Sequence, residues 1–275
     1  DRWLNSQGRL SRPMILEKGS NHYVPLDWDR AIGIIAKTLN ALKDPNDAYF
    51  YTSGRASNEA AYLWQLLARQ YGTNNLPDCS NMCHESSGVA LNESIGIGKG
   101  TVRLEDFDKA DLIVVVGQNP GTNHPRMLSA LKSAKKSGAS ILSINPLKET
   151  GMRRFRHPQS PIDMLGAGTQ ISDDHVDIKV NGDMALFRAI GSIILDKGVH
   201  DMDFINLNTT GFLDYANIAK AVDWDLTEDL TGQSRDRIYE ISDYFCRSKR
   251  TIVCWAMGIT QHKNSVNTIR EIMNV

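Results

Sequence analysis

Apolar residues along this chain follow two patterns in turn: segments with apolar residues at helical spacing, and short segments that are rich in apolar residues. Residues 28–42 carry apolar side chains at helical spacing, and Asp27 is a suitable N-cap residue, so we predict a helix there. A short strand is predicted at 48–52 and a helix at 58–70, which together form one strand–loop–helix unit.

The run Leu112–Val116 is continuously apolar, as expected for a parallel strand covered on both faces. A helix at 125–137 and a strand at 140–144 follow, which is the crossover of a doubly wound fold. Further strands are predicted at 176–180 and 251–256, further helices at 183–196, 202–206, 234–248 and near 272–275, and a loop at 153–169.

This alternation predicts an α/β fold with a doubly wound, mostly parallel, Rossmann-like sheet flanked by helices. Part of a second α/β domain is expected before it, with the division at 1–78 and 79–275. Val114, Ile141, Ile178 and Val253 should then lie in strands of a single sheet.

Composition fits a globular protein, with 275 residues that are 41% hydrophobic and 23% charged. The formal net charge of -1 argues against a nucleic-acid-binding face, and no apolar run approaches the ~20 residues of a membrane span. The chain begins without Met and ends inside a predicted helix, so we expect an internal fragment of a longer chain.

Four cysteines, Cys79, Cys83, Cys246 and Cys254, are too few for a disulfide framework in a chain of this size. Cys83 is followed directly by His84, and a zinc site is disfavoured because adjacent residues bind one tetrahedral ion with difficulty. A thiolate is a soft metal ligand and an imidazole exchanges protons near neutral pH. The pair therefore indicates a metal centre with a proton acceptor, or else a buried cysteine beside a surface histidine.

Three loops follow predicted strands, at 117–120, 145–146 and 257–261, where ligands bind in open α/β sheets. Glycine there allows close approach of a diphosphate, and amide and hydroxyl side chains can bind polar groups. The alternative is that the Asn-Pro pairs only form turns and that Asp183 only caps a helix. The glycine-rich segment 96–100 is read as a turn and the basic cluster 153–157 as a solvated loop.

Several motifs occur in a fixed order, at 71–75, 78–84, 117–120, 123–125 and 257–261. This set resembles the catalytic alpha subunits of molybdopterin oxidoreductases, in the formate-dehydrogenase-like branch, from about Gly8 to the last residue. The resemblance implies that Cys83 ligates molybdenum or tungsten, and that His84 orients substrate and moves a proton while formate is oxidised to CO2. Alternatives are a nitrate-type oxyanion reductase, against which His84 argues, and a non-catalytic cofactor-binding scaffold.

The resemblance also implies a bis-molybdopterin guanine dinucleotide cofactor. Residues 1–78 would be the N-terminal part of a split α/β cofactor domain, and 79–275 a molybdopterin-dinucleotide-binding domain truncated at its C-terminus. Asn145 stands where many relatives carry an acidic residue. The expected cofactor-binding residues are Arg55, Gly117, Gln118, Asn119, Asn123, Asn145, Gly182, Asp183, Met257, Gly258, Thr260 and Gln261.

We have further expectations about the iron–sulfur cluster, the substrate, the partners and the location. A 4Fe-4S cluster is expected only in a part that precedes this chain, and none within it. Formate is the expected substrate, with an electron-transfer partner subunit or carrier, no nucleic acid and no membrane segment. We expect a cytoplasmic protein, and an inactive fragment when the 275 residues are isolated.

Overall fold

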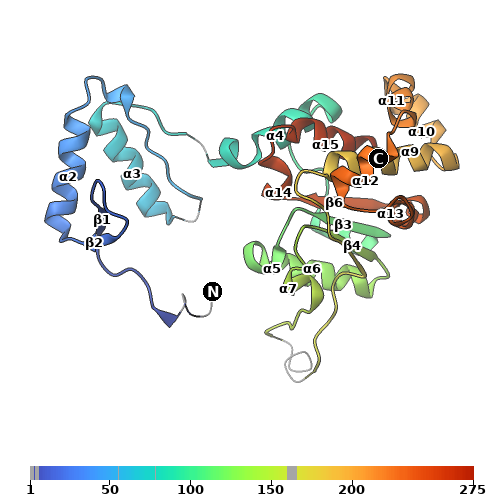
Figure 1. Ribbon diagram of the computed structural model, residues 1–275, viewed down its shortest axis with the longest axis horizontal. Coiled ribbons are helices and arrows are strands. Elements are labelled where there is room, and N and C mark those ends of the chain that lie inside the picture. Colours follow the sequence, from blue (N-terminus) through green and yellow to red (C-terminus); the bar gives the residue numbers. More distant parts are fainter. Residues whose placement is uncertain (1–2, 4–5, 55, 78, 160–165) are drawn as a thin grey trace. The chain divides into compact units, whose positions relative to one another are not determined.

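The computed structural model describes all residues except 1–2, 4–5, 55, 78 and 160–165. The chain divides into two compact units, residues 1–82 and 83–275 (Figure 1).

The first unit includes α2 (Trp28–Asn40) and α3 (Asn58–Tyr71), in agreement with the sequence pattern. Asp27 caps α2, because its carboxylate accepts the N–H of Arg30 at 2.7 Å. A short 3-10 turn, η1, spans Pro45–Asp47. The antiparallel hairpin of β1 (Met14–Leu16) and β2 (Tyr23–Pro25) was not predicted.

The predicted strand at 48–52 was wrong. Phe50 donates its N–H to the carbonyl of Asn75 at 2.9 Å, and the Asn75 side chain donates to the carbonyl of Ala48 at 3.2 Å. These bonds hold the segment as an irregular loop. Its apolar residues are nevertheless buried, since Ala48 and Phe50 form a small core with Ala68.

The second unit is built on a four-stranded parallel sheet, which confirms the predicted α/β class. Its strands are β3 (Leu112–Val116), β4 (Ser140–Ile144), β5 (Asp174–Val176) and β6 (Thr251–Trp255). Their spatial order is β5-β4-β3-β6. Figure 1 labels β4, β3 and β6, which lie side by side in that order.

Ile178 was predicted in a strand but lies beyond the end of β5. Its N–H donates to the carbonyl of Val176 at 3.0 Å, so the chain turns tightly and leaves the ladder. The N–H of Lys179 then donates to the carbonyl of Thr231, away from the sheet. Ile178 remains buried, which is why its apolar character resembled that of a strand residue.

Helices cover both faces of this sheet, as a doubly wound fold requires (Figure 1). Leu112, Val114 and Val116 point to one face, where they pack with residues of α4 (Cys79–Ile95), α9 (Asp183–Lys197), α13 (Arg235–Arg247) and α15 (Ser265–Asn274). Ile113 and Val115 point to the other face, against α6 (Pro125–Lys136), α7 (Thr150–Arg153) and η2 (Leu104–Lys109).

The remaining helices in the described part of the chain are short. They are α5 (Pro120–Asn123), α10 (Met202–Asn208), α11 (Phe212–Lys220), α12 (Trp224–Thr231) and α14 (Met257–Thr260). Sequence reasoning predicted α10 and missed the other four, together with α4 and α7. In the part of the chain that the structure describes, no helix has the length and apolar character needed to cross a bilayer.

Candidate functional site

All four strands run in parallel, so the segments that follow them meet at one edge of the sheet, here called the carboxyl edge. The chain adds β4 and β5 on one side of β3, whereas β6 lies on the other side. This change of direction between β3 and β6 marks the point where open α/β sheets bind ligands. Gly117 follows β3 and Gly258 follows β6, so both flank that point.

Gly117 and Gly258 are in direct backbone contact. The N–H of Gly258 donates to the carbonyl of Gly117 at 3.0 Å. A Cβ on Gly258 would lie 2.5 Å from that carbonyl oxygen, and a Cβ on Gly117 would lie 2.9 Å from the Cα of Gly258. Only glycine fits at this contact, so packing between the two loops already explains both residues. Their contact with a diphosphate stays a prediction.

Cys83 is half-buried in α4, and its carbonyl is held by the loop after β6. Thr260 Oγ1 donates to this carbonyl at 2.6 Å, and Gln261 Nε2 donates to it at 3.4 Å. Ser86 Oγ in turn donates to the carbonyl of Thr260 at 3.2 Å. The predicted cofactor residues Thr260 and Gln261 therefore fix Cys83 at the carboxyl edge.

His84 follows at a break in α4, where its φ of -135° and ψ of 19° depart from helical values. Its side chain is exposed, and Nδ1 lies 3.4 Å from Ser87 Oγ. That hydroxyl accepts the indole N–H of Trp255 at 2.9 Å. A hydroxyl both donates and accepts, so Ser87 can pair with either neutral tautomer of His84. In either tautomer, whether or not Nε2 carries the proton, Nδ1 can keep its hydrogen bond to Ser87 Oγ.

The other two cysteines whose side chains are described are poor candidates for a thiolate ligand. Burial raises the pKa of the Cys254 thiol to about 11, and burial also raises the pKa of Cys246. Both groups are therefore thiols at neutral pH. Cys83 remains the candidate ligand among the described cysteine side chains.

Gln118, after β3, carries a buried acceptor atom without a partner. Its Nε2 lies 3.3 Å from His124 Nδ1 and from Met127 Sδ, whereas its Oε1 has no hydrogen bond to any described residue. Asn264 Oδ1, beyond α14, is likewise buried and without a described partner. An unpartnered buried acceptor is costly, so each would gain from a ligand that donates a hydrogen bond.

Asn119 and Asn145 are brought together by a residue that sequence reasoning missed, Glu149. Asn119 Nδ2 donates to Glu149 Oε2 at 2.6 Å, and Asn145 Nδ2 approaches Glu149 Oε1 at 3.4 Å. Asn119 Oδ1 also accepts the N–H of Thr122 at 3.1 Å and so caps α5. The loops after β3 and β4 are therefore joined through one carboxylate.

Asp183 lies at the start of α9 and is buried. Burial raises the pKa of its carboxyl group to about 6, against a smaller lowering effect of its own backbone hydrogen bond and of His262. Gly182 before it is packed tightly, since a Cβ there would lie 2.6 Å from the carbonyl oxygen of Leu230. Packing against α12 thus explains Gly182 without a ligand.

The remaining predicted residues are placed less centrally. Asn123 lies at the exposed end of α5, and Met257 is the exposed first residue of α14. Arg55 lies outside the described residues. Sequence reasoning missed Ser86, Ser87, Glu149, Trp255, His262 and Asn264. The small-residue run after His84 and the acid shortly after Asn145 were the signals available.

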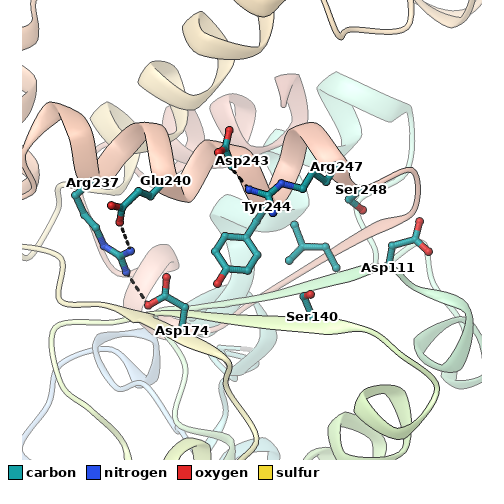
Figure 2. A pocket seen from close by; sticks show the side chains of 10 residues that line it. Asp111, Ser140, Asp174, Arg237, Glu240, Asp243, Tyr244, Arg247 and Ser248 are labelled. Carbon is teal, nitrogen blue, oxygen red and sulfur yellow. Dashed lines mark hydrogen bonds and ion pairs between the residues drawn. The ribbon is translucent and has the colours of Figure 1, made fainter.

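A hollow of about 450 Å³ lies at the opposite, amino edge of the same sheet, beneath α13 (Figure 2). Figure 2 shows Arg237 extended between Asp174 and Glu240, with which it forms ion pairs at 2.7 and 2.8 Å. Asp243 pairs with Arg247 at 3.3 Å. The charges of this hollow are engaged with one another, and it lies at the edge opposite to Cys83 and Gly117.

Among the described residues, no group of three or more His, Cys, Asp or Glu side chains is arranged to hold a metal ion. In that part of the chain, Cys83 can therefore supply one ligand only.

A family model for molybdopterin oxidoreductases matches residues 9–275. The chain is 50% identical over 279 residues to an uncharacterised oxidoreductase of Mycobacterium tuberculosis, with 99% of this chain and 36% of that protein covered. It is 43% identical to protein YdeP of Escherichia coli, over 100% of this chain and 38% of YdeP. It is 30% identical to formate dehydrogenase H of Escherichia coli, over 97% of this chain and 36% of that protein.

The chain thus spans little more than a third of the length of these relatives. Among solved structures, acetylene hydratase from Pelobacter acetylenicus has the same fold, with a TM-score of 0.62 and 18% identity over 96% of this chain and 34% of that one. The match to the family covers nearly the whole chain and agrees with the doubly wound sheet. The chain belongs to the molybdopterin oxidoreductase family.

Proposed function

We propose that the protein to which this chain belongs oxidises formate to CO2, with Cys83 as the protein ligand of molybdenum or tungsten. The observation that carries the proposal is the Cys83–His84 pair, held at the carboxyl edge beside the change of direction between β3 and β6. The similarity to formate dehydrogenase H supports formate as the substrate. The cytoplasmic location and the electron-transfer partner stay predictions.

The residues around the pair fit a metal-bearing cofactor. Cys83 is half-buried, and its main chain is fixed by Thr260 and Gln261, so its thiolate would be held in place. The unpartnered acceptors Gln118 Oε1 and Asn264 Oδ1 fit a ligand rich in N–H and O–H donors. A molybdopterin guanine dinucleotide is such a ligand, and when bound it would supply the metal that accepts two electrons.

His84 would accept the proton that formate loses. The residue is exposed and contacts Ser87 through Nδ1, which leaves Nε2 as the ring nitrogen available for proton transfer. The hydroxyl of Ser87 is oriented by Trp255, and its own proton can turn toward or away from Nδ1. The imidazole therefore has a partner in each protonation state.

Two variants of the intact protein separate the metal ligand from the proton acceptor. Cys83→Ser should lower metal content and turnover together, because a hydroxyl ionises far less readily than a thiol. His84→Ala should keep metal content near that of the wild type and cut formate-dependent dye reduction by ~10²–10⁴-fold. Metal is measured by elemental analysis, and Cys246→Ser serves as the matched cysteine control.

Three results would count against the proposal. Wild-type metal content and turnover in both variants would show that the pair is structural. Reduction of nitrate without oxidation of formate would favour an oxyanion reductase. Absence of molybdenum and tungsten from the intact wild-type protein would favour a scaffold role.

A further inference from the structure

We infer that Glu149 binds the vicinal diol of the ribose in the nucleotide part of the cofactor, an inference that rests on the proposed function. In doubly wound nucleotide-binding units, an acidic residue after the second strand accepts hydrogen bonds from ribose hydroxyls. Here β3, α6 and β4 form that unit, and β4 is followed by the neutral Asn145. The carboxylate of Glu149 lies beside Asn145 and can take the role of that acidic residue.

The Glu149 side chain faces the ends of β3 and β4. It accepts from Asn119 after β3 at 2.6 Å and from Asn145 after β4 at 3.4 Å. Glu149 also occupies the N-cap position of α7, yet its side chain makes no cap hydrogen bond there. The carboxylate is thus turned away from its own helix and toward the carboxyl edge.

The close approach of this loop depends on a pair of glycines. A Cβ on Gly151 would lie 2.8 Å from the Cα of Gly121, and a Cβ on Gly121 would lie 3.0 Å from the Cα of Gly151. The backbones of α5 and α7 therefore touch, which fixes Glu149 next to Asn119. A binding group held in this way loses little conformational freedom when a ligand arrives.

Glu149 keeps capacity for further hydrogen bonds. A carboxylate offers about four acceptor positions, and the two asparagines take one on each oxygen. No described cation forms an ion pair with Glu149, since the adjacent Lys148 pairs with Asp177 at 3.4 Å. The side chain is only half-buried, so part of the carboxylate is open to a ligand. A pair of neighbouring hydroxyls can donate to its two oxygens at once.

The test uses the intact protein freed of cofactor, with GDP and 2′,3′-dideoxy-GDP as probes in calorimetric titrations. The wild type should bind GDP at least about tenfold more tightly than 2′,3′-dideoxy-GDP, because hydrogen bonds from the ribose hydroxyls to a charged acceptor are strong. Glu149→Met, of similar length and without an acceptor, should bring the ratio of the two affinities close to one. Glu149→Gln keeps one acceptor and should give an intermediate ratio.

Asp177→Asn is the matched control, because it removes the other carboxylate that anchors this loop and does not contact the two asparagines. It should keep the wild-type ratio. Equal affinities of the wild type for both nucleotides, or a full ratio in Glu149→Met, would overturn the role of Glu149 and leave the proposed function intact. If the wild type binds neither nucleotide, both this inference and the guanine dinucleotide in the proposed function are wrong.

Discussion

The two edges of the sheet in the second unit are built from the same strands but differ in how their polar groups are paired. At the amino edge, Arg237 bridges Asp174 and Glu240 (Figure 2). Asp111 also pairs with Arg250 there, at 2.8 Å. At the carboxyl edge, Gln118 Oε1 and Asn264 Oδ1 lack described partners. The charged groups named at the amino edge are paired within the chain, whereas two buried acceptor atoms at the carboxyl edge have no described partner.

The pairing of polar groups indicates which edge binds a ligand more clearly than the presence of a hollow does. A ligand in the hollow at the amino edge would have to break existing ion pairs or leave them in place, and would gain little from either. A ligand at the carboxyl edge would satisfy buried atoms that are now unpartnered, and each such atom costs about 1–3 kcal/mol. The hollow is therefore a poorer candidate than the edge that carries Cys83.

The largest expected effect concerns the glycine contact at the carboxyl edge. Gly258→Ala places a Cβ 2.5 Å from the carbonyl oxygen of Gly117, where backbone atoms on both sides cannot give way. We expect a loss of more than about 3 kcal/mol in the free energy of unfolding, because overpacking that cannot relax is severe.

Gly138→Ala, in the turn before β4 at the amino edge, is the control. An added Cβ there would meet no atom within 4 Å, and φ is 103°, so only backbone strain of about 1–2 kcal/mol should appear. Denaturant unfolding, with hydrogen exchange of the β3 amides as the probe of this unit, measures both variants. Equal losses would show that the carboxyl edge is no more tightly packed than the turn.

Much of this fold could be predicted because burial on both faces leaves a continuous apolar run. The strands at 112–116, 140–144 and 251–255 lie within one residue of the predicted limits at each end. The errors at 48–52 and at Ile178 have a common cause. Apolar residues in both segments are buried although they belong to no strand, and a single sequence does not distinguish a buried loop residue from a buried strand residue.

The candidate site was predicted only in part, because adjacency in sequence is visible and adjacency in space is not. Cys83 and His84 are neighbours in the chain and were identified together. Ser87 and Trp255 meet only because α4 packs beside β6. Glu149 meets Asn119 only because the glycines of α5 and α7 touch. Such contacts follow from the topology, which periodicity alone does not give.

The buried carboxyl group of Asp183 should lower the stability of the folded protein at neutral pH. The pKa of Asp183 is raised by burial from 3.8 to about 6, so the folded state binds the proton more tightly than the unfolded state. The contribution of Asp183 to stability should therefore be greatest below pH 4, fall as the pH rises from about 4 to 6, and level off above that.

Asp183→Asn should remove this pH dependence and raise the free energy of unfolding at pH 7 by up to about 3 kcal/mol, at 1.36 kcal/mol per pKa unit. Urea unfolding at several pH values between 3.5 and 7.5 measures the effect. An unchanged pH profile in Asp183→Asn would mean that this carboxylate is solvated or paired in the folded protein.

The smallest effect is expected at the amino edge, and its sign is opposite. A hydrogen bond from Lys197, together with Arg247, lowers the pKa of Asp243 below its usual value of 3.8. Its contribution to stability is therefore present at neutral pH and is lost as the pH falls through the lowered pKa. The Asp243 side chain is 38% exposed, so solvent screens the pair and Asp243→Asn should cost less than about 1 kcal/mol at pH 7. Urea unfolding in low and high salt measures the effect, which salt should reduce further. A loss as large as that of Gly258→Ala, or a gain like that of Asp183→Asn, would show that the two edges do not differ in the way proposed.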